Sequence, residues 1–124
     1  NAGTAIFART LPRRAPPEEG LSLVYVGARD CAPCQAWDRD RRPDLLSSGA
    51  LRHVAFREIV VDRLADLRSP QTWPGQTADL RRHFEPLGAP QWLLLRDDAI
   101  LGKAAGLSQW DERMRPLLRY VAGR

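Results

Sequence analysis

The chain contains two cysteines, Cys31 and Cys34, and only two residues separate them. A disulfide between them would close a loop too small to stabilise a fold by restricting the unfolded chain. The pair is therefore expected to do chemistry or to bind a ligand. Two thiols at this spacing can alternate with a disulfide, because a mixed disulfide on the first sulfur lies within reach of the second.

The surrounding sequence predicts that a strand leads into the pair and that a helix begins there. Residues 21–26 form a mainly apolar, β-prone run typical of a buried strand, and a helical pattern runs on from Cys34. Cys31 then lies at a helix N-terminus, where unpaired backbone N–H groups and the helix dipole favour an anion. This position predicts a lowered pKa for the Cys31 thiol, with Cys34 as the resolving thiol. Pro33 fits the first turn, where its missing donor costs nothing.

The remaining predicted elements complete a small α/β domain. We predict further strands at 54–61, 91–95 and 99–105, a turn at Asp97-Asp98, and helices at 34–46, at 77–84 with Thr77 as its cap, and beyond a cap at Ser108. Pro43 either kinks the first helix or begins a second piece, and Pro116 interrupts the pattern of the last. The order predicts a mixed sheet of four or five strands with helices on both faces. Residues 1–19 are interpreted as an N-terminal arm and 20–124 as one domain.

The chain contains four tryptophans. Trp37, Trp92 and Trp110 fall at helix or strand positions and are expected in the core. Trp73 lies in a Pro/Gly-rich loop and is the candidate for an exposed contact with a partner.

With these elements in place, the sequence resembles the thioredoxin family. The predicted strand 21–26 corresponds to the strand leading into the family's active site, and Cys31-Ala32-Pro33-Cys34 corresponds to its Cys-Gly-Pro-Cys motif. Pro90 stands where the family carries a cis-proline, and the spacing from Pro90 is kept without gaps as far as Gly106. The resemblance implies a thioredoxin fold in which Pro90 faces the cysteines and the backbone of Ala89 pairs with substrate backbone.

Several positions depart from the family pattern. Tyr25 replaces a buried acid six positions before the first cysteine, and Asp30 replaces the tryptophan directly before it. The charge of Asp30 is expected to raise the pKa of the Cys31 thiol, with Arg29 offsetting it. The span between Val61 and Pro90 is longer than in a minimal thioredoxin. These departures resemble the exported, substrate-restricted thioredoxin-like proteins, including those linked to sulfur oxidation.

The predicted function is thiol–disulfide exchange. Ala32-Pro33 resembles the Gly-Pro of reducing thioredoxins, which favours reduction of a disulfide in a protein partner, at the expense of a thiol electron donor and without a cofactor. An alternative is a binding module whose cysteines form an inert disulfide. A zinc site completed by His53 and His83 is not favoured, because their spacing matches no regular zinc pattern.

Charge and hydropathy exclude other classes. The formal net charge is +4, but acids and arginines alternate, as in 38–42, which is typical of a solvated surface and not of a nucleic-acid-binding stripe. No apolar run approaches the roughly 20 residues that span a bilayer. We expect an extracytoplasmic monomer without membrane insertion; a removed export signal is compatible with the sequence.

Overall fold

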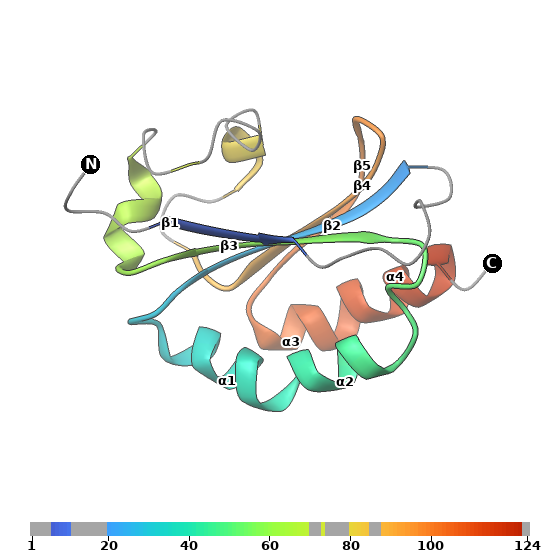
Figure 1. The fold of residues 1–124 in the computed structure, drawn as a ribbon, viewed down its shortest axis with the longest axis horizontal. Coiled ribbons are helices and arrows are strands. Elements are labelled where there is room, and N and C mark those ends of the chain that lie inside the picture. The colour runs from blue at the N-terminus through green and yellow to red at the C-terminus, as the bar shows by residue number, and fades with distance from the viewer. Residues whose placement is uncertain (1–5, 11–19, 70–72, 74–79, 85–87, 123–124) are drawn as a thin grey trace.

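A five-stranded mixed sheet forms the centre of the structure, a computed structural model that describes residues 6–10, 20–69, 73, 80–84 and 88–122 (Figure 1). The strands run in the order β1-β3-β2-β4-β5. β2 and β3 are parallel, whereas β1 is antiparallel to β3, β4 to β2, and β5 to β4. Their bounds are β1 Ile6–Thr10, β2 Leu21–Ala28, β3 Ala55–Val61, β4 Gln91–Arg96 and β5 Ala99–Ala105.

The central strand β2 carries the cysteine pair at its carboxyl end. Every residue of β2 except Ser22 is buried, because β2 is paired on both edges and covered on both faces. An almost uninterrupted apolar strand is the sequence signature of that position. The predicted strand ends at residue 26, and β2 continues two residues further, to Ala28.

All α-helices of the described residues pack against one face of the sheet (Figure 1). They are α1 Ala32–Asp40, α2 Arg42–Ser47, α3 Leu107–Gln109 and α4 Arg115–Ala122, with a π-helical turn, Trp110–Met114, joining the last two. The core on this face centres on Trp37, Trp92 and Trp110, whose ring centroids lie 4.6 to 5.1 Å apart. The prediction that these three tryptophans are core is confirmed.

Two prolines shape the ends of these helices. Pro43 lies in the first turn of α2, which confirms that it begins a second helical piece. Pro116 is the second residue of α4, and one residue separates it from the end of the π-helical turn. We attribute this widened turn to the missing N–H and the ring of Pro116, which exclude a regular bond to the preceding turn. The helix begins with Gly106 as its N-cap, at a φ of 84°, so Ser108 does not cap it.

The opposite face is covered differently. A five-residue 3-10 helix, η2 (Leu64–Arg68), and a 3-10 turn at 80–83 lie there, with Trp73 and Phe84 packed inward. The predicted helix 77–84 is therefore a short 3-10 turn over its described part, and its proposed cap Thr77 lies outside the described residues. The expectation of helices on both faces holds, with 3-10 helices on this one.

The strand β1 is a feature that the sequence analysis missed. Residues 6–10, which we interpreted as part of an arm, pair antiparallel with β3 from Ile6–Val61 to Thr10–Arg57 and extend the sheet. The prolines that argued against a strand begin at Pro12 and lie outside the described residues. A domain boundary at residue 20 stays a prediction.

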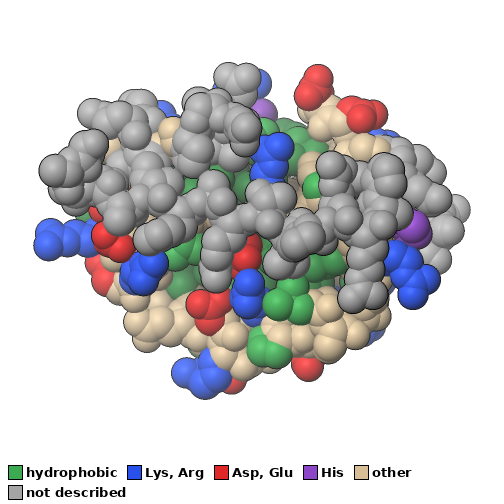
Figure 2. Space-filling model, viewed as in Figure 1, with side chains coloured by type: hydrophobic (Ala, Val, Ile, Leu, Met, Phe, Trp, Pro, Cys, Tyr) green, Lys and Arg blue, Asp and Glu red, His purple; other side chains and the backbone are tan. Residues whose placement is uncertain are grey.

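Within the described ranges, no helix is both long enough and apolar enough to cross a membrane. Basic and acidic side chains lie interspersed over the face shown in Figure 2.

Candidate active site

The cysteine pair lies where β2 passes into α1. Cys31 is the N-cap residue of α1 in an extended conformation, and Cys34 lies in the first turn. The two Cα atoms are 5.2 Å apart and the sulfurs form a disulfide. Both cysteines are buried, whereas Ala32 and Pro33 between them are exposed, so the motif reaches the surface at the helix start.

Two backbone groups contact the sulfur of Cys31. The backbone N–H of Cys34 donates a hydrogen bond to Cys31 Sγ at 3.3 Å, which is the capping contact of α1. The carbonyl oxygen of Ala89 lies 3.5 Å from the same sulfur. A helix N–H directed at sulfur stabilises a thiolate, and the carbonyl can accept the proton of a thiol. Cys31 is thus suited to exist in both protonation states.

The loop that supplies Ala89 contains a cis peptide bond and is held by two hydrogen bonds. The Ala89–Pro90 peptide bond is cis, as the resemblance implies. The buried side chain of Gln91 donates to the carbonyl of Gly88 at 2.6 Å, and the N–H of Gly106 donates to the carbonyl of Pro90 at 2.9 Å. The sequence analysis missed Gln91, although a polar residue opening a buried strand was a signal. The contact from Ala89 to Cys31 confirms that this loop and the cysteines lie together.

Asp30 forms a contact that the sequence did not predict. Its carboxylate accepts a hydrogen bond from the backbone N–H of Leu64 at 2.8 Å. The N-cap residue of η2, Arg63, makes no side-chain capping bond, so Asp30 caps η2 from another part of the chain.

Arg29, next to Asp30, also contacts the segment that leads into η2. Its guanidinium forms an ion pair with Asp62 at 3.2 Å, and its carbonyl accepts a hydrogen bond from the side chain of Gln35 at 2.8 Å. Arg29 and Asp30 therefore connect the loop before Cys31 to Asp62 and to the start of η2 at Leu64. An offset of the Asp30 charge by Arg29 stays a prediction.

Trp73 lies next to the site but is not an exposed contact. It is 6% exposed, its Nε1–H donates to the carbonyl of Leu67 at 3.1 Å, and its ring packs against Phe84 at 5.5 Å. The prediction of an exposed partner contact is wrong, because the composition of the loop did not reveal the apolar cluster into which Trp73 folds. That cluster includes both cysteines, so Trp73 supports the site from the inside.

A buried carboxylate lies on the strand beside Tyr25. Glu58 on β3 is in register with Tyr25 on β2 and is completely buried. The guanidinium of Arg42 donates to both of its oxygens, at 2.6 and 2.9 Å, and these hydrogen bonds hold the pKa of Arg42 above its usual value. Tyr25 also stacks on Trp37 at 5.5 Å. The sequence analysis missed this ion pair, because the partners lie on different elements.

In the part of the chain that the structure describes, no group of three or more His, Cys, Asp or Glu side chains is arranged to hold a metal ion.

Comparison with known proteins supports the fold. No family model and no curated protein sequence matches the chain. Thioredoxin F from spinach chloroplast, in its long form, matches with a TM-score of 0.54 and 15% identity over 86% of this chain and 73% of that one. The periplasmic thioredoxin SoxS from Paracoccus pantotrophus, in its reduced form, matches with a TM-score of 0.47 and 21% identity over 83% and 96%. The likeness to the spinach protein shows that the chain has the thioredoxin fold, as predicted.

Proposed function

We propose that the protein is a thiol–disulfide oxidoreductase that uses Cys31 and Cys34. The observation that carries this proposal is the position of Cys31 Sγ: it caps α1, accepts the N–H of Cys34 and lies within bonding reach of the second sulfur. A helix N-terminus lowers the free energy of a thiolate, which is the reactive form in exchange.

The proposed reaction transfers two electrons from the protein to a disulfide in a partner. The Cys31 thiolate attacks one partner sulfur, and the other leaves as a thiolate that takes up a proton. The Cys34 thiol loses its proton and attacks Cys31 Sγ, which releases the first partner sulfur as a thiolate and leaves the Cys31–Cys34 disulfide. An external dithiol donor then returns two electrons and two protons to the pair.

Docking of the partner is assigned to the loop before β4. Ala89 is half-buried, and its carbonyl lies beside Cys31 Sγ, so an extended partner segment paired with the Ala89 backbone would bring its disulfide to the reactive sulfur. Pro90 fixes this loop. Ala32 and Pro33 form the exposed surface between the sulfurs and tune the pair.

Disulfide reduction measured with insulin and dithiothreitol tests the proposal. We expect Cys31→Ser to abolish exchange and Cys34→Ser to accumulate a mixed disulfide, because the resolving sulfur is then missing. Ala99→Ser is the matched control, since it adds an exposed hydroxyl at the end of the sheet away from the Ala89 loop and keeps both thiols. Full activity in both cysteine variants would disprove the mechanism.

Equilibration with dithiothreitol distinguishes exchange from the alternative of an inert disulfide. A pair that reduces readily supports exchange, whereas a pair that stays oxidised under a large excess of dithiol favours a binding module.

We further propose that the protein acts outside the cytoplasm, because Tyr25 and Asp30 depart from the general thioredoxin pattern. We also propose that it is a monomer. Fractionation of the host, with detection of the endogenous protein, tests the location. Light scattering tests the oligomeric state.

A further inference from the structure

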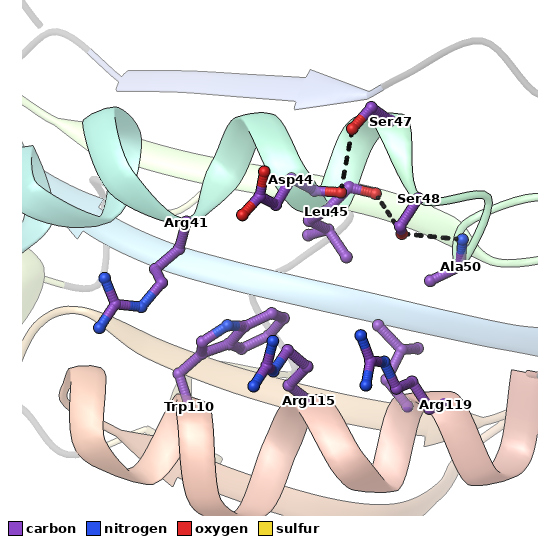
Figure 3. A pocket seen from close by; sticks show the side chains of 10 residues that line it. Arg41, Asp44, Leu45, Ser47, Ser48, Ala50, Trp110, Arg115 and Arg119 are labelled. Carbon is purple, nitrogen blue, oxygen red and sulfur yellow. Dashed lines mark hydrogen bonds between the residues drawn. The ribbon is translucent and has the colours of Figure 1, made fainter.

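A groove lies between α2 and α4, on the helix face of the sheet and beyond the carboxyl end of α1 (Figure 3). Its volume is about 310 Å³. Arg41, at the α1–α2 junction, marks its near end, so the nine residues of α1 separate the groove from Cys31, a length of about 14 Å. The groove is therefore a site apart from the cysteine pair.

Arginines give the groove a positive rim. Arg115 and Arg119 are one turn apart on α4, and Figure 3 shows their side chains directed across the groove towards α2. Within the described residues, neither guanidinium forms a salt bridge; Arg41 is already engaged, donating to both oxygens of Asp111 at 2.9 and 2.8 Å. Asp44 is the acidic residue of the lining. The rim thus presents two guanidinium groups that suit carboxylates.

The floor of the groove is apolar, and the same two helices each carry one exposed large apolar side chain outside the lining. Leu45, Trp110 and Leu118 form the floor. Leu46 on α2 and Tyr120 on α4 follow lining residues in the sequence and are 38% and 66% exposed. An apolar floor flanked by exposed arginines is typical of a surface that binds another protein.

From this arrangement we propose that the groove docks an acidic, leucine-containing segment of a protein partner. One apolar side chain of the segment would occupy the floor, and flanking carboxylates would pair with Arg115 and Arg119. We favour a protein segment over a small molecule because Arg115 and Arg119 are both exposed and lie one turn apart, so that two carboxylates of one segment can pair with them. The inference that this partner is the protein whose disulfide is reduced rests on the proposed function.

Fluorescence anisotropy with a labelled, end-blocked peptide that alternates glutamate and leucine tests the proposal on the full chain with the cysteines oxidised. We expect saturable binding that weakens at least about tenfold in the double variant Arg115→Glu, Arg119→Glu. Arg113→Glu is the matched control, because Arg113 is exposed on the same helical stretch but does not line the groove; its affinity should stay within about twofold. Arg119→Glu alone tests the rim without a change beside Asp111.

Three results would overturn the inference: no saturable binding, equal weakening in the Arg113 control, or equal affinity for a peptide with glutamine in place of glutamate. Binding of benzoate with affinity equal to that of the peptide would indicate a small-anion site and would also contradict a protein segment. Binding needs no exchange, so Cys31→Ser should retain it. If the unaltered chain reduces insulin but does not bind the peptide, the groove is refuted and the proposed function stands. If it binds the peptide but does not reduce insulin, only the function is refuted.

Discussion

The two faces of the sheet are built in different ways. On the helix face, Trp37, Trp92 and Trp110 interlock beneath α1, α2 and α4. On the cysteine face, both sulfurs pack against η2 and short connecting segments that are attached by individual hydrogen bonds, such as that of Asp30 to Leu64. We therefore expect the helix face to supply most of the stability and the cysteine face to open locally without unfolding of the domain.

Two neighbouring arginines at the α1–α2 junction, Arg41 and Arg42, differ in how far their ion pairs are buried. Arg42 donates to the fully buried Glu58, whereas Arg41 donates to Asp111, where both side chains are about one-third exposed. Both pairs form two hydrogen bonds between a guanidinium and a carboxylate, but the Arg42–Glu58 pair is less exposed to solvent than the Arg41–Asp111 pair. The buried pair is therefore expected to matter far more when one partner is removed.

The difference between the helix face and the cysteine face is tested most strongly by replacing one tryptophan on each. We expect Trp37→Ala to lower the free energy of unfolding by about 4 kcal/mol and Trp73→Ala by about 3 kcal/mol or less, because Trp37 contacts three aromatic rings and Trp73 one. Urea unfolding measures both values. Hydrogen exchange should show a global loss of protection for the first and a loss confined to η2 and its surroundings for the second. Equal and global effects would contradict the difference between the faces.

Removal of the buried carboxylate is expected to have the next largest effect. Glu58→Ala should cost about 3 kcal/mol, since it leaves the partly buried guanidinium of Arg42 with only the more distant carboxylate of Asp38, 4.0 Å away. The double variant Glu58→Leu, Arg42→Met is the control and should recover most of this loss, because apolar side chains of similar size avoid burying charge. A Glu58→Ala variant as stable as the unaltered chain in urea would show that the pair is not structurally important.

Asp30 tests how the cysteine face is attached. Asp30→Ala removes the acceptor that caps η2 and should cost about 1 kcal/mol, with faster amide exchange at residues 64–68. Asp30→Asn keeps an acceptor oxygen and loses only the charge, so its exchange in η2 should stay closer to that of the unaltered protein. The cap is refuted if the two variants accelerate exchange equally.

The smallest effect is expected at the partly exposed pair Arg41–Asp111 and depends on pH. Hydrogen bonds from Arg41 hold the pKa of Asp111 below its ordinary value. A carboxyl whose pKa is lowered by folding adds stability above its unfolded pKa, near 4, and loses it as the pH falls through the lower folded value. Asp111→Asn should therefore cost less than about 1 kcal/mol at neutral pH.

The difference between this variant and the unaltered chain should shrink as the solution is acidified below about pH 4. Urea midpoints measured at falling pH give this difference. A gap that widens in acid would contradict the assigned pair.

The sequence alone determined the local features of this protein. The apolar run at 21–26, the cysteine spacing and Pro33 predict a strand followed by a helix with Cys31 at its start, because each depends on neighbours in the chain. Pro90 before a strand, read through the family resemblance, predicted the loop whose Ala89 carbonyl lies beside Cys31. Hydrophobic periodicity likewise found the core tryptophans.

Tertiary structure decided whatever depends on residues far apart in the sequence. The Asp30 cap on η2, the Arg42–Glu58 pair and the burial of Trp73 each join separate elements, and no local pattern specifies such pairing. Strand β1 is decided in the same way, since a five-residue segment becomes a strand only where β3 offers an open edge. The surroundings of the cysteines thus come from the fold, and their position at a helix start comes from the sequence.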